Sequence, residues 1–136
     1  MMKRTEIVSH IRKLMADEVS EVKYVDLWNH NVEFIEQEAA WERPAVFVEF
    51  GETVWDARQN RSMRGVCPLL LHVVTDYTGP DSMFMAYELT DKVVDALSFN
   101  SGNGWDIGAL QRTLTCHNHE ELVENIEEFT LRYFRR

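Results

Sequence analysis

The sequence has little cysteine and no long hydrophobic run. Only two cysteines occur in 136 residues, Cys67 and Cys116, and without a secretion signal we expect both to be free thiols. The longest apolar segment, 66–74, is interrupted by Pro68 and His72, and it falls short of the roughly 20 residues that cross a bilayer. The N-terminus also lacks the apolar segment of a signal peptide. We therefore expect a protein of the cytoplasm with no membrane contact.

Basic charge is scarce as well. Lysine and arginine number 14 against 23 aspartates and glutamates, which gives a formal net charge of −9. An acidic surface repels phosphate backbones, so general nucleic-acid binding is disfavoured, although DNA could still pass such a surface without being held. A chain of this length, with 45% hydrophobic residues, can bury a core of its own. We expect one domain spanning residues 1–136.

Signatures of catalysis are missing too. The sequence contains no glycine-rich phosphate loop and no serine in a nucleophile elbow. Acidic residues do occur in adjacent pairs, such as Glu127-Glu128, but neighbours on a strand point to opposite faces and cannot act together. These absences predict a protein that is not an enzyme.

One segment, Cys116-His117-Asn118-His119-Glu120, concentrates potential metal ligands. On a strand, His117 and His119 would share a face while Cys116 pointed to the other, so a third ligand would have to come from elsewhere, such as His72. We expect no stoichiometric zinc. A small α+β enzyme or ligand-binding module that uses His72, His117 and His119 stays open as an alternative.

The stretch from Met63 to Ser98 predicts a long strand, a turn and an amphipathic helix. Alternate strand residues, among them Leu71 and Val73, form an apolar face, whereas the face of His72 is mixed. The helix should begin with Asp81 or Ser82 as its N-cap. Its apolar positions recur every three or four residues. We expect a shared core made by these residues: Leu71, Val73, Leu89, Val93 and Leu97.

The remaining segments complete an α+β fold. We expect the order α-β-β-β-α-β-β, with a mostly antiparallel sheet and the helices packed on one face. The last segment also fits helical spacing, but its β-branched and aromatic residues favour a strand. The expected elements are a helix at 5–15, strands at 22–28 and 45–55, a loop with a helical turn at 29–43, and strands at 109–117 and 126–134.

Three arginines within seven residues, Arg58, Arg61 and Arg64, stand out in this acidic chain. Trp55 and Met63 flank them in a polar stretch that should form a long, projecting hairpin. One interpretation is a solvated loop. The other is an arm that docks on acidic residues of a neighbouring subunit, since arginine and tryptophan are favoured at interfaces. Two acidic groups could receive such an arm, and the sequence does not choose between the stretch 33–42 and Glu120, Glu121 and Glu124.

The order and pattern of these segments resemble the tail terminator, or tail-completion, proteins of long-tailed bacteriophages and prophages. The resemblance runs through the strand Pro44-Ala45-Val46-Phe47-Val48-Glu49-Phe50 and the polar hairpin that ends at Arg64-Gly65. It continues through the strand Leu69-Leu70-Leu71-His72-Val73-Val74 and the helix that contains Ala86 to Leu97.

This resemblance implies a structural role as a minor tail protein. Such proteins form a ring, commonly a hexamer, that caps the tail tube, stops its growth and meets the head-completion proteins, while DNA passes through. It implies assembly in the cytoplasm of the bacterial host and a final place in the virion tail. The candidate subunit interface is the arm with Trp55, Arg58, Arg61, Met63 and Arg64. Another head-to-tail connector or a tail tube component remains an alternative.

Overall fold

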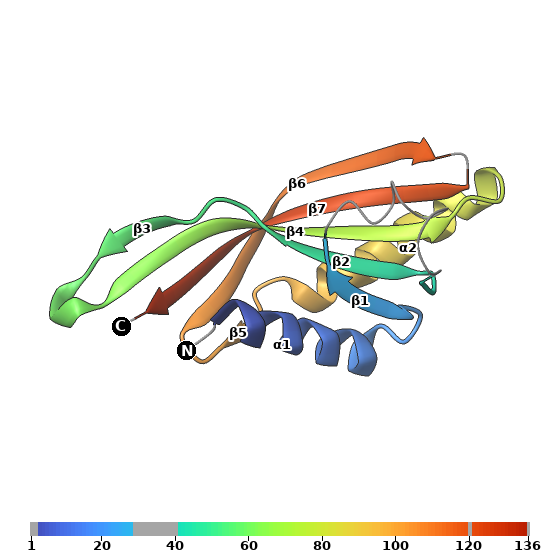
Figure 1. The fold of residues 1–136 in the computed structure, drawn as a ribbon. Coiled ribbons are helices and arrows are strands. Elements are labelled where there is room, and N and C mark those ends of the chain that lie inside the picture. The colour runs from blue at the N-terminus through green and yellow to red at the C-terminus, as the bar shows by residue number, and fades with distance from the viewer. Residues whose placement is uncertain (1–2, 29–40, 120, 136) are drawn as a thin grey trace.

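The structure, a computed structural model, describes residues 3–28, 41–119 and 121–135 (Figure 1). Most of the expected loop at 29–43 therefore lies outside the described residues. Described elements, in chain order, are α1 (Lys3–Glu18), β1 (Tyr24–Leu27), β2 (Ala45–Phe50), β3 (Val54–Ala57), the short 3₁₀ helix η2 (Gln59–Arg61), β4 (Met63–Asp76), α2 (Pro80–Leu97), β5 (Ser101–Gly102), β6 (Trp105–His119) and β7 (Leu122–Arg135).

The expected order of elements is confirmed, with two additions. The segment 45–55 is not one strand but two, β2 and β3, because the chain turns away at Gly51, whose amide donates a hydrogen bond to the carbonyl of Pro68. The short strand β5 was not expected, and β6 begins at Trp105 rather than at Ala109. The last segment is a strand, as its composition indicated.

The seven strands form one curled sheet with the order β1-β2-β4-β7-β6-β5, and β3 pairs with β4 beside this path. Only β1 and β2 run parallel. The central strand β4 pairs along its whole length with β7, from Met63 opposite Arg135 to Asp76 opposite Leu122. On its other side β4 pairs with β2 from Leu69 onward and with β3 before that point. A single strand therefore runs from the body of the molecule into the hairpin.

Both helices lie on the same side of the sheet (Figure 1), as the sequence predicted. Leu71 and Val73 of β4 belong to one buried cluster together with Leu89, Val93 and Leu97 of α2. This confirms the predicted core, which forms because one apolar strand face and one apolar helix stripe can leave water only against each other. Among the described residues, no helix is long and apolar enough to cross a membrane.

The predicted N-cap of α2 is wrong. The helix begins at Pro80, and the capping position is Gly79, whose φ of 122° suits glycine. Proline is favoured in the first helical turn because its fixed φ fits the helix and it has no amide to leave unpaired. Ser82 instead closes the turn before the helix, since its Oγ donates to the carbonyl of Gly79 at 2.6 Å.

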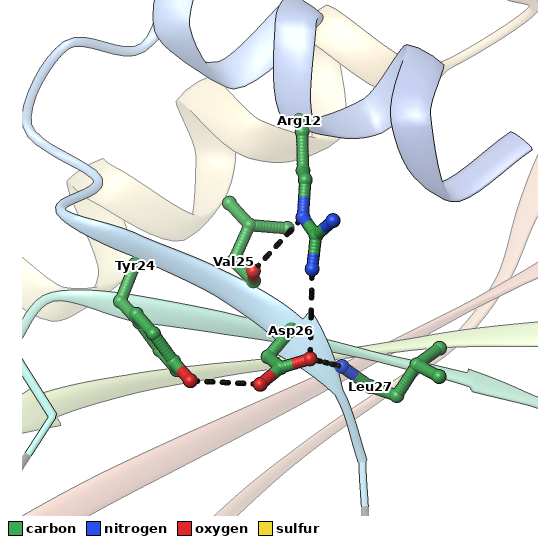
Figure 2. A network of polar contacts seen from close by, with 5 residues as sticks. All are labelled: Arg12, Tyr24, Val25, Asp26 and Leu27. Carbon is green, nitrogen blue, oxygen red and sulfur yellow. Dashed lines mark hydrogen bonds and ion pairs between the residues drawn. The ribbon is translucent and has the colours of Figure 1, made fainter. Parts of the chain in front are cut away.

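A polar network fastens α1 to the edge strand β1 (Figure 2). Arg12 of α1 donates from Nε to the carbonyl of Val25 at 3.2 Å and lies 3.5 Å from the carboxylate of Asp26. That carboxylate also accepts hydrogen bonds from the Tyr24 hydroxyl at 2.7 Å and from the Leu27 amide at 2.8 Å. The bond to Asp26 raises the pKa of Tyr24, because it stabilises the protonated phenol.

Candidate functional site

A three-stranded arm projects from the body of the molecule (Figure 1). It consists of β3, the first residues of β4 and the end of β7, with β4 in the middle. All four residues of β3 are exposed, so no part of the described body covers this strand. The projecting hairpin predicted from the sequence is therefore present, and the third strand, β7, is what stiffens it.

Aromatic packing holds the base of the arm. Gly65 of β4 lies between Trp55 of β3 and Tyr133 of β7 in the register. A Cβ atom at Gly65 would lie 2.9 Å from the Trp55 ring, so the glycine makes room for the indole to cross the strand. The two rings meet edge to face at a centroid distance of 5.1 Å. The Tyr133 hydroxyl is 2.7 Å from Thr53 Oγ1, and the Arg135 guanidinium lies 6.0 Å from the Trp55 ring centre.

A tight turn closes the tip of the arm. Asn60 and Arg61 both have left-handed backbone conformations, with φ of 60° and 63°. Asparagine tolerates this region better than most residues do, which suits it to a turn. Ser62 supports the turn through its Oγ, which donates to the carbonyl of Gln59 at 2.8 Å. As a result, the side chains of Arg58 and Arg61 are displayed to solvent at the far end of the arm.

The five predicted interface residues do lie on one arm, but they are not equivalent. Asp56 carries an ion pair to Arg58 at 3.5 Å and one at 3.7 Å to Arg64, which lies opposite it on β4. Within the described residues no ion pair of Arg61 is found. Met63 pairs with Ala57 beside the tip, whereas Trp55 lies at the base.

On the sheet face away from the helices, His72 is the centre of a second polar cluster. Its Nδ1 lies 2.5 Å from Glu124 Oε2 and its Nε2 lies 2.7 Å from Glu49 Oε1. The indole of Trp28 stacks on the imidazole at 3.8 Å, and His72 is buried. Sequence reasoning missed these partners, although Glu49 and Glu124 sit in the two strands that flank β4 and share its open face.

The cluster leaves neither ring nitrogen of His72 free. Both ring nitrogens of His72 already face carboxylates, and among the described residues no group of three His, Cys, Asp or Glu side chains could hold a metal ion. The side chains of His117 and His119 lie outside the described residues. Burial raises the pKa of the Cys67 and Cys116 thiols, which disfavours the reactive thiolate.

A cavity of about 510 Å³ is bounded by the turn after α1, Pro44, the end of β4 with the turn that follows it, and α2 as far as Lys92. The end of β4 and the start of α2 lie at the opposite end of the molecule from the arm tip (Figure 1). Apolar side chains, including Met85 and Leu89, share its wall with Glu21, Glu88 and Lys92. No local sequence pattern predicts this cavity, because it depends on how separate segments of the chain meet.

Thr75 gives the cavity an unsatisfied polar group. The residue lines the cavity and is only 8% exposed, and its Oγ1 has no hydrogen-bond partner in the described structure. Buried hydroxyls are normally satisfied, because an unpaired one has lost its water without replacement. Near the cavity, α2 also exposes three large side chains to solvent, Phe84, Met85 and Tyr87.

Comparisons with known proteins give a likeness of fold. No family model matches the sequence, and no curated protein matches it. Among solved structures, the fold is similar to one chain of a structure described as the virion of a native gene transfer agent particle. The TM-score is 0.61 at 15% sequence identity, over 90% of this chain and 84% of the other. At that identity, the likeness establishes the fold that the two chains share.

Proposed function

We propose that this chain is a tail terminator: a single structural domain that assembles as a ring, caps a phage-type tail tube and joins it to the head-completion proteins. The observation that carries the proposal is the projecting arm, which presents Trp55 together with Arg58 and Arg61 on an otherwise acidic chain. A three-stranded projection with exposed aromatic and arginine side chains suits a subunit contact better than it suits an isolated monomer.

The fold likeness supports a place in a virion. The similar chain belongs to a particle described as a gene transfer agent virion, and the alignment spans most of both chains. A structural role also agrees with the chemistry of the described residues, in which His72 is enclosed by two carboxylates and the thiols have raised pKa values. The protein would assemble in the host cytoplasm and remain in the virion tail, with no cofactor.

Charge favours local contacts in such a ring. Subunits with a net charge of −9 repel one another, so each interface needs contacts of opposite sign. A basic arm that meets carboxylates of the next subunit supplies them head to tail, and a head-to-tail contact can close into a ring. A hexamer would be strongly acidic as a whole, which suits a ring through which DNA passes without being held.

The first prediction concerns the arm. Changing both Arg58→Glu and Arg61→Glu should abolish ring formation and tail completion, while the melting temperature stays nearly unchanged because both side chains are exposed. Electron microscopy and plaque or particle counts measure the two outcomes. A matched control is Lys13→Glu with Arg112→Glu, which changes net charge equally at two exposed sites away from the arm. Rings and infectious particles from the arm variant would contradict the proposal.

A tail tube subunit or another head-to-tail connector is the second candidate. The similar chain is described only as part of a whole virion, and this description fits those roles equally well. The assembly product distinguishes the candidates. A tube subunit should polymerise into tubes of unlimited length, a connector should bind the head rather than the tube, and a terminator should stop at a single ring on a tube end.

A further inference from the structure

We propose that the cavity at the start of α2 receives the arm tip of a second copy of the chain, with the guanidinium of Arg61 donating to Thr75 Oγ1. This inference rests on the proposed ring-forming function and names the surface that accepts the arm. Arginine combines an aliphatic stem with five N–H donors on a planar head, and so it suits a cavity with apolar walls and a buried acceptor.

The charges around the cavity leave one carboxylate for a cationic occupant. Three carboxylates line the cavity, at Glu21, Asp76 and Glu88, together with Lys23 and Lys92. Glu21 is ion-paired with Lys92, and Asp76 is ion-paired with Arg43. The carboxylate of Glu88, which lines the cavity, is therefore the natural second partner for an arginine whose head reaches Thr75.

The placement of the two surfaces fits a contact between copies. Arm tip and cavity lie at opposite ends of the molecule (Figure 1), so one chain cannot fill its own cavity, but each copy can fill the next. Both ends also expose apolar side chains, Val54 and Trp55 on the arm and Phe84 and Met85 on α2. Such patches on a soluble chain mark interaction sites, and two different patches that meet give a head-to-tail contact.

The structure also weakens one receiver that the sequence left open. Glu124 is 6% exposed and bonded to His72, so it cannot meet an arm from outside. Glu120 lies outside the described residues, as does most of the stretch 33–42. Glu121 is exposed, and the structure does not test it as a receiver. The cavity is the receiver proposed here because its lining combines Glu88 with the Thr75 hydroxyl, which has no partner in the described structure.

A charge exchange tests the contact. Association of purified protein is followed by sedimentation over a concentration series at low ionic strength. Arg61→Glu alone and Glu88→Arg alone should each shift the association midpoint at least tenfold toward higher concentration, and the two changes in one chain should largely restore it. Asp95→Arg is the matched control, because it alters the same helix at an exposed site that does not line the cavity. It should leave association nearly unchanged.

A second variant tests the contact in the cavity without changing any charge. Thr75→Val keeps the side-chain shape and removes the hydroxyl that has no partner in the described structure. It should raise the melting temperature of the monomer, because an unpaired buried hydroxyl is lost, and weaken association about tenfold, because the guanidinium loses its acceptor. If Thr75 had only a structural role, its replacement would not raise the melting temperature and weaken association at the same time.

Several results would overturn the inference. If the Arg61→Glu, Glu88→Arg chain associates no better than either single variant, or Asp95→Arg weakens association as much as Glu88→Arg, the cavity is not the receiver. Native mass spectrometry that finds a co-purified small molecule in the cavity, with association intact in Glu88→Arg, would also exclude the arm. In these cases rings of the unchanged chain still form, so the proposed function stands. If the unchanged chain forms no ring, the proposed function fails first.

Discussion

Glu127 is a carboxylate placed where a sheet usually carries an apolar side chain. It lies on the helix-facing side of β7 opposite Leu71, and it is only 3% exposed. Burial raises its pKa, and the nearby Asp91 adds to the rise, while a 2.6 Å hydrogen bond from Thr113 Oγ1 partly offsets it. The folded state therefore holds a proton more tightly than an exposed glutamate does.

The raised pKa of Glu127 predicts that the folded state loses stability as the pH rises. Below the pKa of an exposed glutamate, Glu127 is protonated in both the folded and the unfolded state, so no buried charge lowers the stability. As pH rises through the interval up to the raised folded pKa, the unfolded state loses its proton first and stability falls. Glu127→Gln should therefore raise the melting temperature at pH 7 and much less at pH 4. Thermal unfolding at both pH values checks this, with Glu128→Gln as the control. An equal rise of the melting temperature at both pH values would contradict the raised pKa of Glu127.

At single residues, the sequence predicted chemistry poorly. His72 could be assigned to the open sheet face by alternation, but its two carboxylate partners come from other strands and its burial depends on Trp28 stacking above it. The N-cap of α2 was misassigned because Pro80 and Gly79 determine the start more strongly than a polar side chain does. Such details depend on contacts between segments that periodicity does not encode.

At the scale of elements, the packing of α2 on β4 carries the fold. Leu89→Ala removes a side chain that is buried in the central cluster, and should cost about 2–5 kcal/mol of unfolding free energy. Phe84→Ala is the control on the same helix, because Phe84 is 67% exposed and should cost less than about 0.5 kcal/mol. Urea unfolding measures both. Similar values for the two variants would show that the helix is packed on another face.

The arm depends on one glycine. Gly65→Val would place a Cβ atom 2.8 Å from Thr53 Cγ2 and 2.9 Å from the Trp55 ring, so the indole should leave Tyr133. We expect a cost of about 1–3 kcal/mol and a shift of the Trp55 indole N–H resonance, identified with Trp55→Phe. Ala57→Val adds bulk at an exposed arm position as the control. An unshifted resonance would mean that the indole does not lie across Gly65.

Elements were predictable where one face is apolar and the other polar. Alternation identified β4 and β7, and the helical stripe identified α2, because burial imposes these periods. The break between β2 and β3 was missed, since it depends on Gly51 meeting Pro68 of another strand, and alternation within the segment does not show that contact. The arm was expected as a hairpin, but its third strand comes from the far end of the chain and left no local signal.

The whole molecule has two different ends. An acidic chain that carries a basic, aromatic arm at one end and a cavity lined by Glu88 and Thr75 at the other is suited to repeated head-to-tail contacts. Contacts that depend on exposed charges are weak individually and are screened by salt. The chain can therefore stay monomeric when dilute and assemble when concentrated or on a tube end.

Electron microscopy of the purified protein at high concentration distinguishes a closed ring from a monomer and from a tube. At an ionic strength near 0.01 M, where the screening length is about 30 Å, it should show closed, single-layer rings with an open centre. These rings should dissociate near 1 M salt, where the screening length is about 3 Å. Monomers at every concentration and salt, or tubes that lengthen without limit, would contradict the central claim that this chain closes into a terminating ring.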